Sequence, residues 1–331
     1  MYESGAGLSV RRNRRQTAPL TFTIFTPAYN RAKVLPRVYG SLVRQTLQDF
    51  EWLVVDNASD DDTPDVVSRW QSSSSFPIRY LRNETNIGFN GSWKRALEAA
   101  RGELFIYLRS ADELTATALE RLKWHWDSIP DDRRPGFSAV TGLAVDEHGT
   151  VHGTLFPRDV IDSDSLEIRY RFRVEGEKFG FQRTDVLRQV GIPDLAGFTG
   201  SIPPSIVWRA IARRYRTRYV NEVFRIYWQD QEFTLSQPRE PWTNAPGRLL
   251  SAEDTLDHDL SWLTAAPLAI YRDAIAFVTS SFHVGRGVIR QRERLRSPVA
   301  VMLWMAAVPV GLAFYLVQSK FPALARRLPS P

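Results

Sequence analysis

The sequence contains no cysteine among its 331 residues. That absence excludes disulfide scaffolds, thiol nucleophiles, zinc ribbons and iron–sulfur clusters. The sequence also lacks a P-loop, a Gly-x-Gly-x-x-Gly motif and a Gly-x-Ser-x-Gly motif, so the usual NTPase, dinucleotide and serine-hydrolase patterns are missing. Residues 1–19 hold several arginines but no apolar run, and we expect a disordered basic arm there, not a secretory signal.

The charges that are present are unevenly distributed. Apolar residues make up 43% of the chain and charged residues 24%, as in ordinary globular proteins. The net charge is +6, yet residues 283–331 alone hold eight arginines and lysines against one acidic residue. A basic excess that flanks an apolar run favours anionic lipid as a partner, and we expect no nucleic-acid partner.

That apolar run covers Pro298–Val317, twenty residues without a charge. As a helix it would be about 30 Å long, the thickness of a bilayer core. Ser297 and Pro298 suit the start of a helix, and Pro309 should kink it. We expect a membrane helix and basic tail over residues 297–331, with a buried core helix as the alternative. Because both ends are basic, a full span and a shallow or re-entrant insertion remain open.

The first half of the chain alternates between strand and helix patterns. Apolar and β-branched runs predict strands, and amphipathic stretches between them predict helices. The predicted strands cover residues 21–26 (stopped by Pro27), 50–55, 78–81 and 104–108, with helices over 34–45, from 63 and over 93–100. This order indicates an α/β fold with a parallel core sheet flanked by helices. Polar residues follow all four strands, which predicts a ligand pocket at one rim of the sheet.

The second half gives an α+β pattern that should complete the sheet. We expect a hairpin of residues 137–146 and 151–156, further strands over 169–174, 178–182, 217–220 and 223–227, and a helix over 204–215. Residues 247–287 are helical in pattern. The predicted domains are a catalytic domain over 20–235 and a helical extension over 236–296, before the membrane segment.

Three blocks of sequence carry a family resemblance. TPAYNRAKVLPRVYGSL, FEWLVVDNASDDDT and NIGFNGSWKRALEAARGELFIYL resemble the nucleotide-binding half of family 2 glycosyltransferases, which have the Rossmann-like GT-A fold. The resemblance covers residues 20–122 and continues more weakly to Tyr227. It implies transfer of a hexose from a UDP- or dTDP-sugar to a hydroxyl of a lipid-linked or polysaccharide acceptor, with inversion, in cell-envelope synthesis. It also implies a catalytic face in the cytoplasm, where nucleotide sugars are made, with the C-terminal segment as anchor.

The resemblance assigns a set of nucleotide-binding residues. Asp56 would accept hydrogen bonds from the pyrimidine or the ribose, as an ionised carboxylate at a strand end can. The full set is Thr26, Pro27, Tyr29, Asn30, Arg31, Asp56, Asn57, Asn86, Gly88 and Arg109.

The chain departs from the family where a metal would bind. The family expects an Asp-x-Asp-Asp run for Mg²⁺ or Mn²⁺, but this chain has Arg109 and Ala111 at the first two positions and keeps Asp112. Asp112 is then the candidate metal ligand and a candidate catalytic residue. Alternatively, Ser110 and Glu113 form a capping box for a following helix, which would make these acids structural. A third possibility is a metal-independent site in which Arg109 binds the pyrophosphate.

The chain departs from the family again where a general base is expected. Pro204 aligns with the glutamate that would take the acceptor proton. Asp194 is the nearest acid and our candidate, with Glu175 and Glu177 further back. The alternative function is a catalytically inactive homologue that binds a nucleotide sugar or a partner enzyme at the membrane.

Two further clusters have spacings that could suit a metal. His148 and His152 straddle a glycine turn, and Asp254, Asp257 and His258 lie among polar residues. We expect both clusters to be solvated side chains and not metal ligands.

Overall fold

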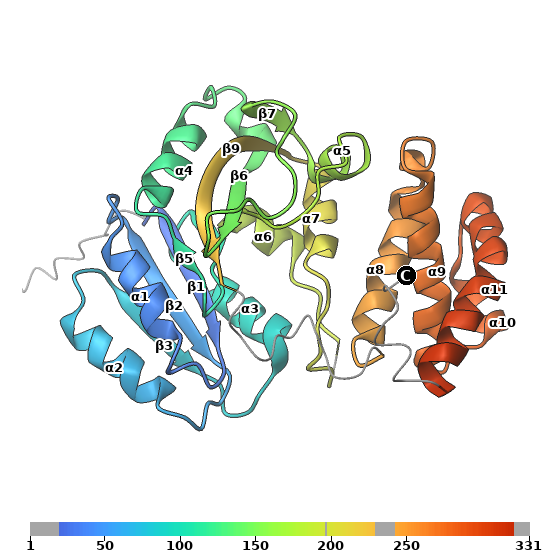
Figure 1. Ribbon diagram of the computed structural model, residues 1–331, viewed down its shortest axis with the longest axis horizontal. Coiled ribbons are helices and arrows are strands. Elements are labelled where there is room, and N and C mark those ends of the chain that lie inside the picture. Colours follow the sequence, from blue (N-terminus) through green and yellow to red (C-terminus); the bar gives the residue numbers. More distant parts are fainter. Residues whose placement is uncertain (1–19, 196, 229–241, 321–331) are drawn as a thin grey trace, which may run out of the picture.

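The computed structural model describes residues 20–195, 197–228 and 242–320 (Figure 1). The predicted basic arm over 1–19 and the end of the basic tail, residues 321–331, lie outside the described residues. The strands are β1 (Phe22–Ala28), β2 (Phe50–Asp56), β3 (Ile78–Arg82), β4 (Leu104–Tyr107), β5 (Glu113–Leu114), β6 (Phe137–Asp146), β7 (Val160–Ser163), β8 (Lys178–Arg183) and β9 (Arg216–Tyr227). The helices are α1 (Leu35–Val43), α2 (Thr63–Ser73), α3 (Gly88–Ala99), α4 (Ala118–Asp127), α5 (Ser165–Tyr170), α6 (Thr184–Val190), α7 (Ser205–Ala212), α8 (Ala245–His258), α9 (Pro267–His283), α10 (Val288–Arg294) and α11 (Pro298–Lys320).

The strands form one mixed sheet in the order β3-β2-β1-β4-β8-β6-β9-β5, with β7 paired to β9. Strands β3, β2, β1 and β4 are parallel, as the alternating pattern predicts. Strand β1 runs to Ala28, two residues beyond its predicted end at Thr26. Pro27 is tolerated because the β1–β4 ladder ends at Phe25, so its missing N–H removes no hydrogen bond to β4.

The predicted strands in the second half are partly wrong. Residues 165–170 form α5 because the Asp164 carboxylate accepts hydrogen bonds from the backbone N–H groups of Leu166 and Glu167, both at 2.9 Å. The predicted strand over 169–174 is therefore absent. The predicted hairpin partner over 151–156 is reduced to one bridge between Val145 and Val151. Residues 217–220 and 223–227 belong to one strand, β9, whose pairing with β6 shifts register where two strands were predicted.

Helices cover both faces of the sheet, which gives a three-layer α/β/α arrangement (Figure 1). Helices α1, α2 and α4 pack on one face around the fully buried Trp52. Helices α3, α6 and α7 pack on the other face around the fully buried Trp93. The fold is the mixed, helix-flanked sheet expected from the sequence.

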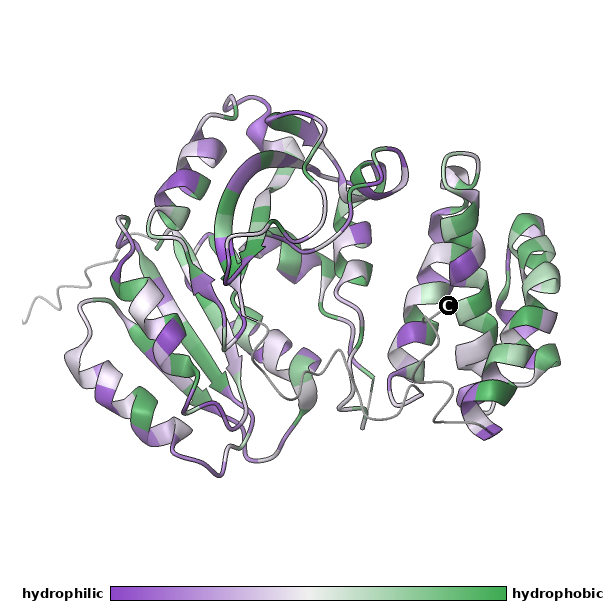
Figure 2. Ribbon diagram, in the orientation of Figure 1, coloured by the Kyte–Doolittle hydropathy of each residue, from purple (hydrophilic) through white to green (hydrophobic). Residues whose placement is uncertain are grey.

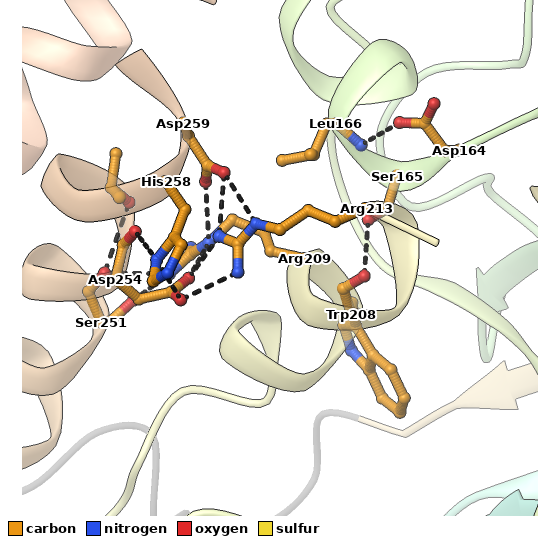
Figure 3. Close-up of polar contacts among 11 residues, drawn as sticks. Asp164, Ser165, Leu166, Trp208, Arg209, Arg213, Ser251, Asp254, His258 and Asp259 are labelled. Carbon is orange, nitrogen blue, oxygen red and sulfur yellow. Dashed lines mark hydrogen bonds and ion pairs between the residues drawn. The ribbon is translucent and has the colours of Figure 1, made fainter. Parts of the chain in front are cut away.

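Helices α8 to α11 form a helical unit beside the sheet, joined to α7 by buried ion pairs (Figure 3). Arg213 Nη2 lies 2.8 Å from both Asp254 Oδ2 and Asp259 Oδ1, and Arg209 Nε lies 3.0 Å from Asp254 Oδ2. Asp254 is thus paired and largely buried, so its predicted solvation is wrong, whereas Asp257 and His258 are exposed as expected. These pairs fix the helical unit against α7.

Helix α11 is the one described helix long and apolar enough to cross a membrane. Its start follows the predicted pattern, because Ser297 Oγ accepts a hydrogen bond of 3.2 Å from the Val299 N–H. It packs against α9.

Candidate functional site

A cavity of about 1020 Å³ opens at the carboxyl ends of β1, β2 and β4. Its far wall comes from β8, β9, α5 and α7. Strand order reverses at β1, which has β2 on one side and β4 on the other, and ligands of open α/β sheets bind at such a point. The cavity therefore lies where the sequence predicts a pocket.

The loop after β1 is held in a fixed shape by the loop after β2. The Asn30 N–H donates to Ser59 Oγ at 2.9 Å, and Asn30 Oδ1 accepts from the Asp60 N–H at 3.0 Å. These bonds hold Asn30 in the left-handed region, with a φ of 53°. The turn presents Tyr29 and Arg31 to the cavity.

Asp56 holds this loop in place through hydrogen bonds. Its buried carboxylate accepts hydrogen bonds from Ser59 Oγ and from the Tyr80 hydroxyl, the latter at 2.5 Å. Burial and the Asp56 carboxylate raise the pKa of Tyr80, so Tyr80 stays a donor to Asp56. A chain of contacts thus runs from Asp56 through Ser59 to Asn30.

Amides join the ends of β2 and β3. Asn57 Nδ2 donates to Asn86 Oδ1 at 2.7 Å, and Asn86 Oδ1 also accepts from the Gly88 N–H at 2.9 Å. Gly88 has a φ of 75°, and a Cβ there would lie 2.9 Å from the Thr199 carbonyl oxygen. Only glycine fits at this start of α3.

Among the residues that the structure describes, the cavity lining holds more cationic than anionic side chains. Arg109 stacks over the Tyr227 ring, 4.6 Å from its centroid. Burial lowers the pKa of Arg31, and the positive charge of Arg109 lowers it further. The two guanidinium groups are therefore close enough to repel each other electrostatically. The cationic side chains of the lining are Arg31, Arg109, Arg169, Lys178 and Arg225.

One carboxylate, that of Glu177, lines the cavity within the described part of the chain. Glu177 Oε2 accepts a hydrogen bond of 2.9 Å from Arg225 Nη2, and its side chain is 47% exposed. Burial acts to raise the pKa of Glu177, but Arg225 and Arg109 outweigh it and bring the pKa below the usual value. Glu177 is therefore ionised and accessible from the cavity.

Asp112 lies behind the lining and faces Arg225, with 3.6 Å between Oδ2 and Nη1. It is fully buried, and burial raises its pKa despite Arg225 and Arg109. Divalent Mg²⁺ and Mn²⁺ need several anionic oxygen ligands, and the described residues hold no group of three or more suitable side chains. One buried carboxyl between two guanidinium groups does not fit such an ion.

The predicted capping box at Ser110 and Glu113 is wrong. Glu113 begins the short strand β5, and the next helix starts at Ala118. The Glu113 carboxylate instead accepts hydrogen bonds from Arg44 at 2.7 Å and from the Trp228 indole at 3.1 Å.

The structure separates the predicted nucleotide-binding residues into two groups. Thr26 is buried and accepts a hydrogen bond from the Trp52 indole, while Asn30 and Asp56 shape the loop as described. The exposed candidate base Asp194 does not line the cavity. The predicted residues that line it are Pro27, Tyr29, Arg31, Asn57, Asn86, Gly88 and Arg109.

Several lining residues were not predicted from the sequence. They come from segments that only the folded sheet brings to the cavity: Arg169 and Trp208 on α5 and α7, Lys178 beside Glu177, and Arg225 and Tyr227 at the end of β9. The weaker resemblance through KFGFQRTDVL and TRYVNEVFRIY was the available signal for Lys178, Arg225 and Tyr227.

Comparison with known proteins identifies a segment in the N-terminal part of the chain. Residues 23–134 match the model of "Glycosyl transferase family 2". Residues 23–134 form a family 2 glycosyltransferase domain. Two sequence relatives of the domain are the abequosyltransferase RfbV of Salmonella typhimurium and the GalNAc(5)-diNAcBac-PP-undecaprenol beta-1,3-glucosyltransferase of Campylobacter jejuni. The first is 32% identical over 107 residues and the second 32% identical over 208 residues.

The coverage of these relatives is partial. The alignments cover 32% and 62% of this chain, and 32% and 63% of the two relatives. Among solved structures, S. aureus TarS 1–349 in complex with UDP has a TM-score of 0.57 at 17% identity, over 93% of this chain and 88% of that one. This likeness shows that the glycosyltransferase domain and the elements after it follow the GT-A fold.

Proposed function

We propose that this protein is a membrane-associated glycosyltransferase that moves a hexose from a UDP- or dTDP-sugar to a hydroxyl of a lipid-linked or polysaccharide acceptor. The observation that carries the proposal is the cavity at the strand ends of a family 2 domain, whose described lining has five cationic side chains and one carboxylate. A nucleotide diphosphate is the ligand that such a charge balance favours. The TarS structure with UDP and the undecaprenol-linked substrate in a relative's name support the donor and acceptor classes.

The reaction we propose is a direct displacement with inversion. The acceptor oxygen forms its bond to the anomeric carbon while the bond from that carbon to the diphosphate oxygen breaks. Glu177, and not Asp194 or Asp112, takes the proton of the acceptor hydroxyl, because it is the carboxylate that the described cavity presents. Its low pKa keeps it ionised, and the departing diphosphate carries the electron pair away.

Arg31 and Arg109 stabilise the leaving diphosphate in this proposal. A guanidinium donates two parallel hydrogen bonds to phosphate oxygens and offsets the charge that develops on them. This assignment replaces the family's metal with Arg109, at the position where the first aspartate is missing. Asp112 then pairs with Arg225 behind the lining.

A lipid-linked acceptor follows from the position of the helical unit. Helix α5 lines the cavity through Ile168 and Arg169, and its other side packs on α9 through Leu166 and Tyr170 against Ile270. Helix α9 in turn carries α11. One helix, α9, thus lies between the α5 wall of the cavity and the apolar helix α11. We propose that α11 holds the protein at the cytoplasmic face of the membrane, with the acceptor entering beside α5.

The alternative function is a nucleotide-sugar-binding protein without transfer activity, which the proline at position 204 favours. A calorimetric screen of UDP- and dTDP-sugars in EDTA and in Mn²⁺, followed by assays of nucleotide release, tests both proposals. Binding in EDTA with turnover supports the transferase, and binding without turnover on any acceptor supports the alternative. A donor that binds only with Mn²⁺ contradicts the proposed role of Arg109.

A further inference from the structure

Helix α11 has apolar residues on two opposite sides, and only one side is covered. Ala300, Trp304, Ala307 and Gly311 are buried against the rest of the helical unit at helical spacing. The opposite side is exposed to solvent and contains Met302, Met305, Ala306, Pro309, Val310, Ala313 and Leu316. Figure 2 shows the hydrophobic colour along most of this helix. A helix that is apolar all round is stable only where both sides are covered.

Helix α9 holds α11 along its length in a parallel arrangement. The Tyr271 hydroxyl donates to the Ala306 carbonyl at 2.9 Å, and Thr279 Oγ1 donates to the Gly311 carbonyl at 3.2 Å. A Cβ on Gly311 would lie 2.6 Å from Val278, so the two helices are in close contact at this point. Helix α11 therefore cannot enter a bilayer without α9.

This packing is incompatible with a span of the bilayer. The bond from Tyr271 to Ala306 places the start of α9 beside the middle of α11. If α11 crossed the membrane, the exposed Arg272 would lie near the centre of the hydrocarbon layer. An arginine at that depth is strongly unfavourable.

The segment before α11 supplies the complementary charge for an anionic surface. Arg290, Arg292, Arg294 and Arg296 are all exposed, and Glu293 is the one acid among them. Arg290 and Arg296 make no side-chain hydrogen bond or ion pair with any residue that the structure describes. Ile289 in the same segment is 78% exposed. Basic residues next to exposed apolar ones are typical of helices at a membrane surface.

We propose that α11 lies in the plane of an anionic bilayer surface, with its exposed side among the acyl chains and the arginines of residues 290–296 on the lipid phosphates. This inference rests on the proposed membrane association of the glycosyltransferase and specifies its geometry. The protein is attached to one leaflet and does not cross the membrane.

The absence of cysteine allows single labels to test this geometry. Met302→Cys and Leu316→Cys place an environment-sensitive fluorophore near the two ends of the exposed side, and Ser75→Cys in an exposed loop is the control. With vesicles of phosphatidylglycerol and phosphatidylcholine, both α11 labels should shift to the blue and be quenched by lipid probes at the same shallow depth. An impermeant reductant added outside should bleach both, and the control should not respond to vesicles.

Two outcomes would overturn the proposal. Protection of one α11 label from the external reductant would indicate a span. A blue shift that depends on protein concentration, without lipid and with no further change on adding vesicles, would indicate that a second copy covers this side.

A charge variant tests the lipid contact separately. Arg290→Gln with Arg296→Gln should weaken binding to anionic vesicles about fivefold for each charge removed. The matched control, Arg158→Gln with Arg173→Gln, removes two exposed arginines elsewhere and should bind as the wild type does. An equal loss of vesicle binding in the two double variants would contradict the assignment of Arg290 and Arg296 as lipid contacts. Calorimetry with UDP in the absence of lipid, on the same variants, separates a failure of docking from a failure of nucleotide binding.

Discussion

At the scale of single residues, Glu177 is the group on which the proposed reaction depends most. We expect Glu177→Gln to lower kcat by about 100-fold or more, the usual contribution of a general base, with little change in donor affinity. Asp194→Asn is the matched control and should leave kcat unchanged, since Asp194 does not line the cavity. Steady-state assays of nucleotide release measure both. An unchanged kcat for Glu177→Gln would place the base elsewhere.

The pH dependence of the rate follows from the direction of the Glu177 pKa. Because that pKa is below the ordinary glutamate value of about 4.3, the carboxylate stays ionised above pH 5. The rate should fall on the acid side only below this range, as Glu177 becomes protonated. An acid limb with a midpoint near pH 6 would contradict Glu177 as the base.

Arg109 is the residue that distinguishes a metal-independent site from the family's usual one. Arg109→Ala should cost roughly 1.5–3 kcal/mol of nucleotide affinity, the range for a charged hydrogen bond. Arg109→Lys should recover part of that loss, because an ammonium keeps the charge but not the paired donors. Calorimetry with UDP in EDTA measures both variants. Equal affinity for wild type and Arg109→Ala would show that the guanidinium does not contact the diphosphate.

At the scale of elements, the ion pairs between α7 and α8 should contribute measurably to stability. Asp254→Asn leaves Arg209 and Arg213 short of a partner, and we expect the free energy of unfolding to fall by about 3 kcal/mol. The exposed Asp257→Asn on the same helix is the control and should change it by less than about 0.5 kcal/mol. Urea titration with a far-UV signal gives both values.

The difference in free energy of unfolding between wild type and Asp254→Asn should depend on pH in one direction. Burial raises the pKa of Asp254, but Arg213 and Arg209 outweigh it and the net shift is downward. A carboxyl with a lowered pKa in the folded state stabilises the fold above the ordinary value of about 3.9, and that stabilisation is lost as the pH falls through the folded-state pKa. Wild type and Asp254→Asn should therefore differ in stability at pH 7 and converge at strongly acidic pH.

The sequence predicts the nucleotide half of the fold well and the second half less well. Strands β1 to β4 are short, apolar and separated by amphipathic helices, so local patterns determine them. Residues 169–174 alternate aromatic and charged side chains as a strand does, but the cap at Asp164 and the buried Leu166 and Tyr170 select a helix. Neither the cap nor the burial is visible in the strand-like pattern itself.

The residues of the candidate site also differ in how well the sequence predicts them. Residues next to β1, β2 and β4 could be predicted because the carboxyl ends of parallel strands meet at one edge. Local patterns do not place Glu177 and Arg225 at the cavity, because their position depends on β8 pairing antiparallel with β4 and on β9 pairing with β6. Distance along the chain favoured Asp194 over Glu177 as the nearest acid to position 204, but the sheet brings Glu177 to the cavity instead.

At the scale of the whole molecule, the cavity and the apolar side of α11 are connected through the packing of α5 on α9 and through the ion pairs of Arg209 and Arg213. Transfer to a lipid-linked acceptor should therefore require the acceptor and the protein on the same vesicle, while donor hydrolysis in water should proceed equally with or without lipid. Assays with acceptor and protein on one vesicle population, or on two separate ones, test this. Equal transfer in both arrangements would contradict a membrane-bound acceptor.

The sheet order also has a consequence for how the protein is made. A nascent chain can form β1 to β4 from local contacts early in translation, but Arg225 and Tyr227 belong to β9, which leaves the ribosome much later. We expect an arrested chain that ends before β9 to be compact but unable to retain nucleotide. Helix α11 emerges last of the described elements, after α9 is already available to bind it. In the proposed in-plane geometry, attachment of α11 to lipid would thus follow the assembly of the elements before it.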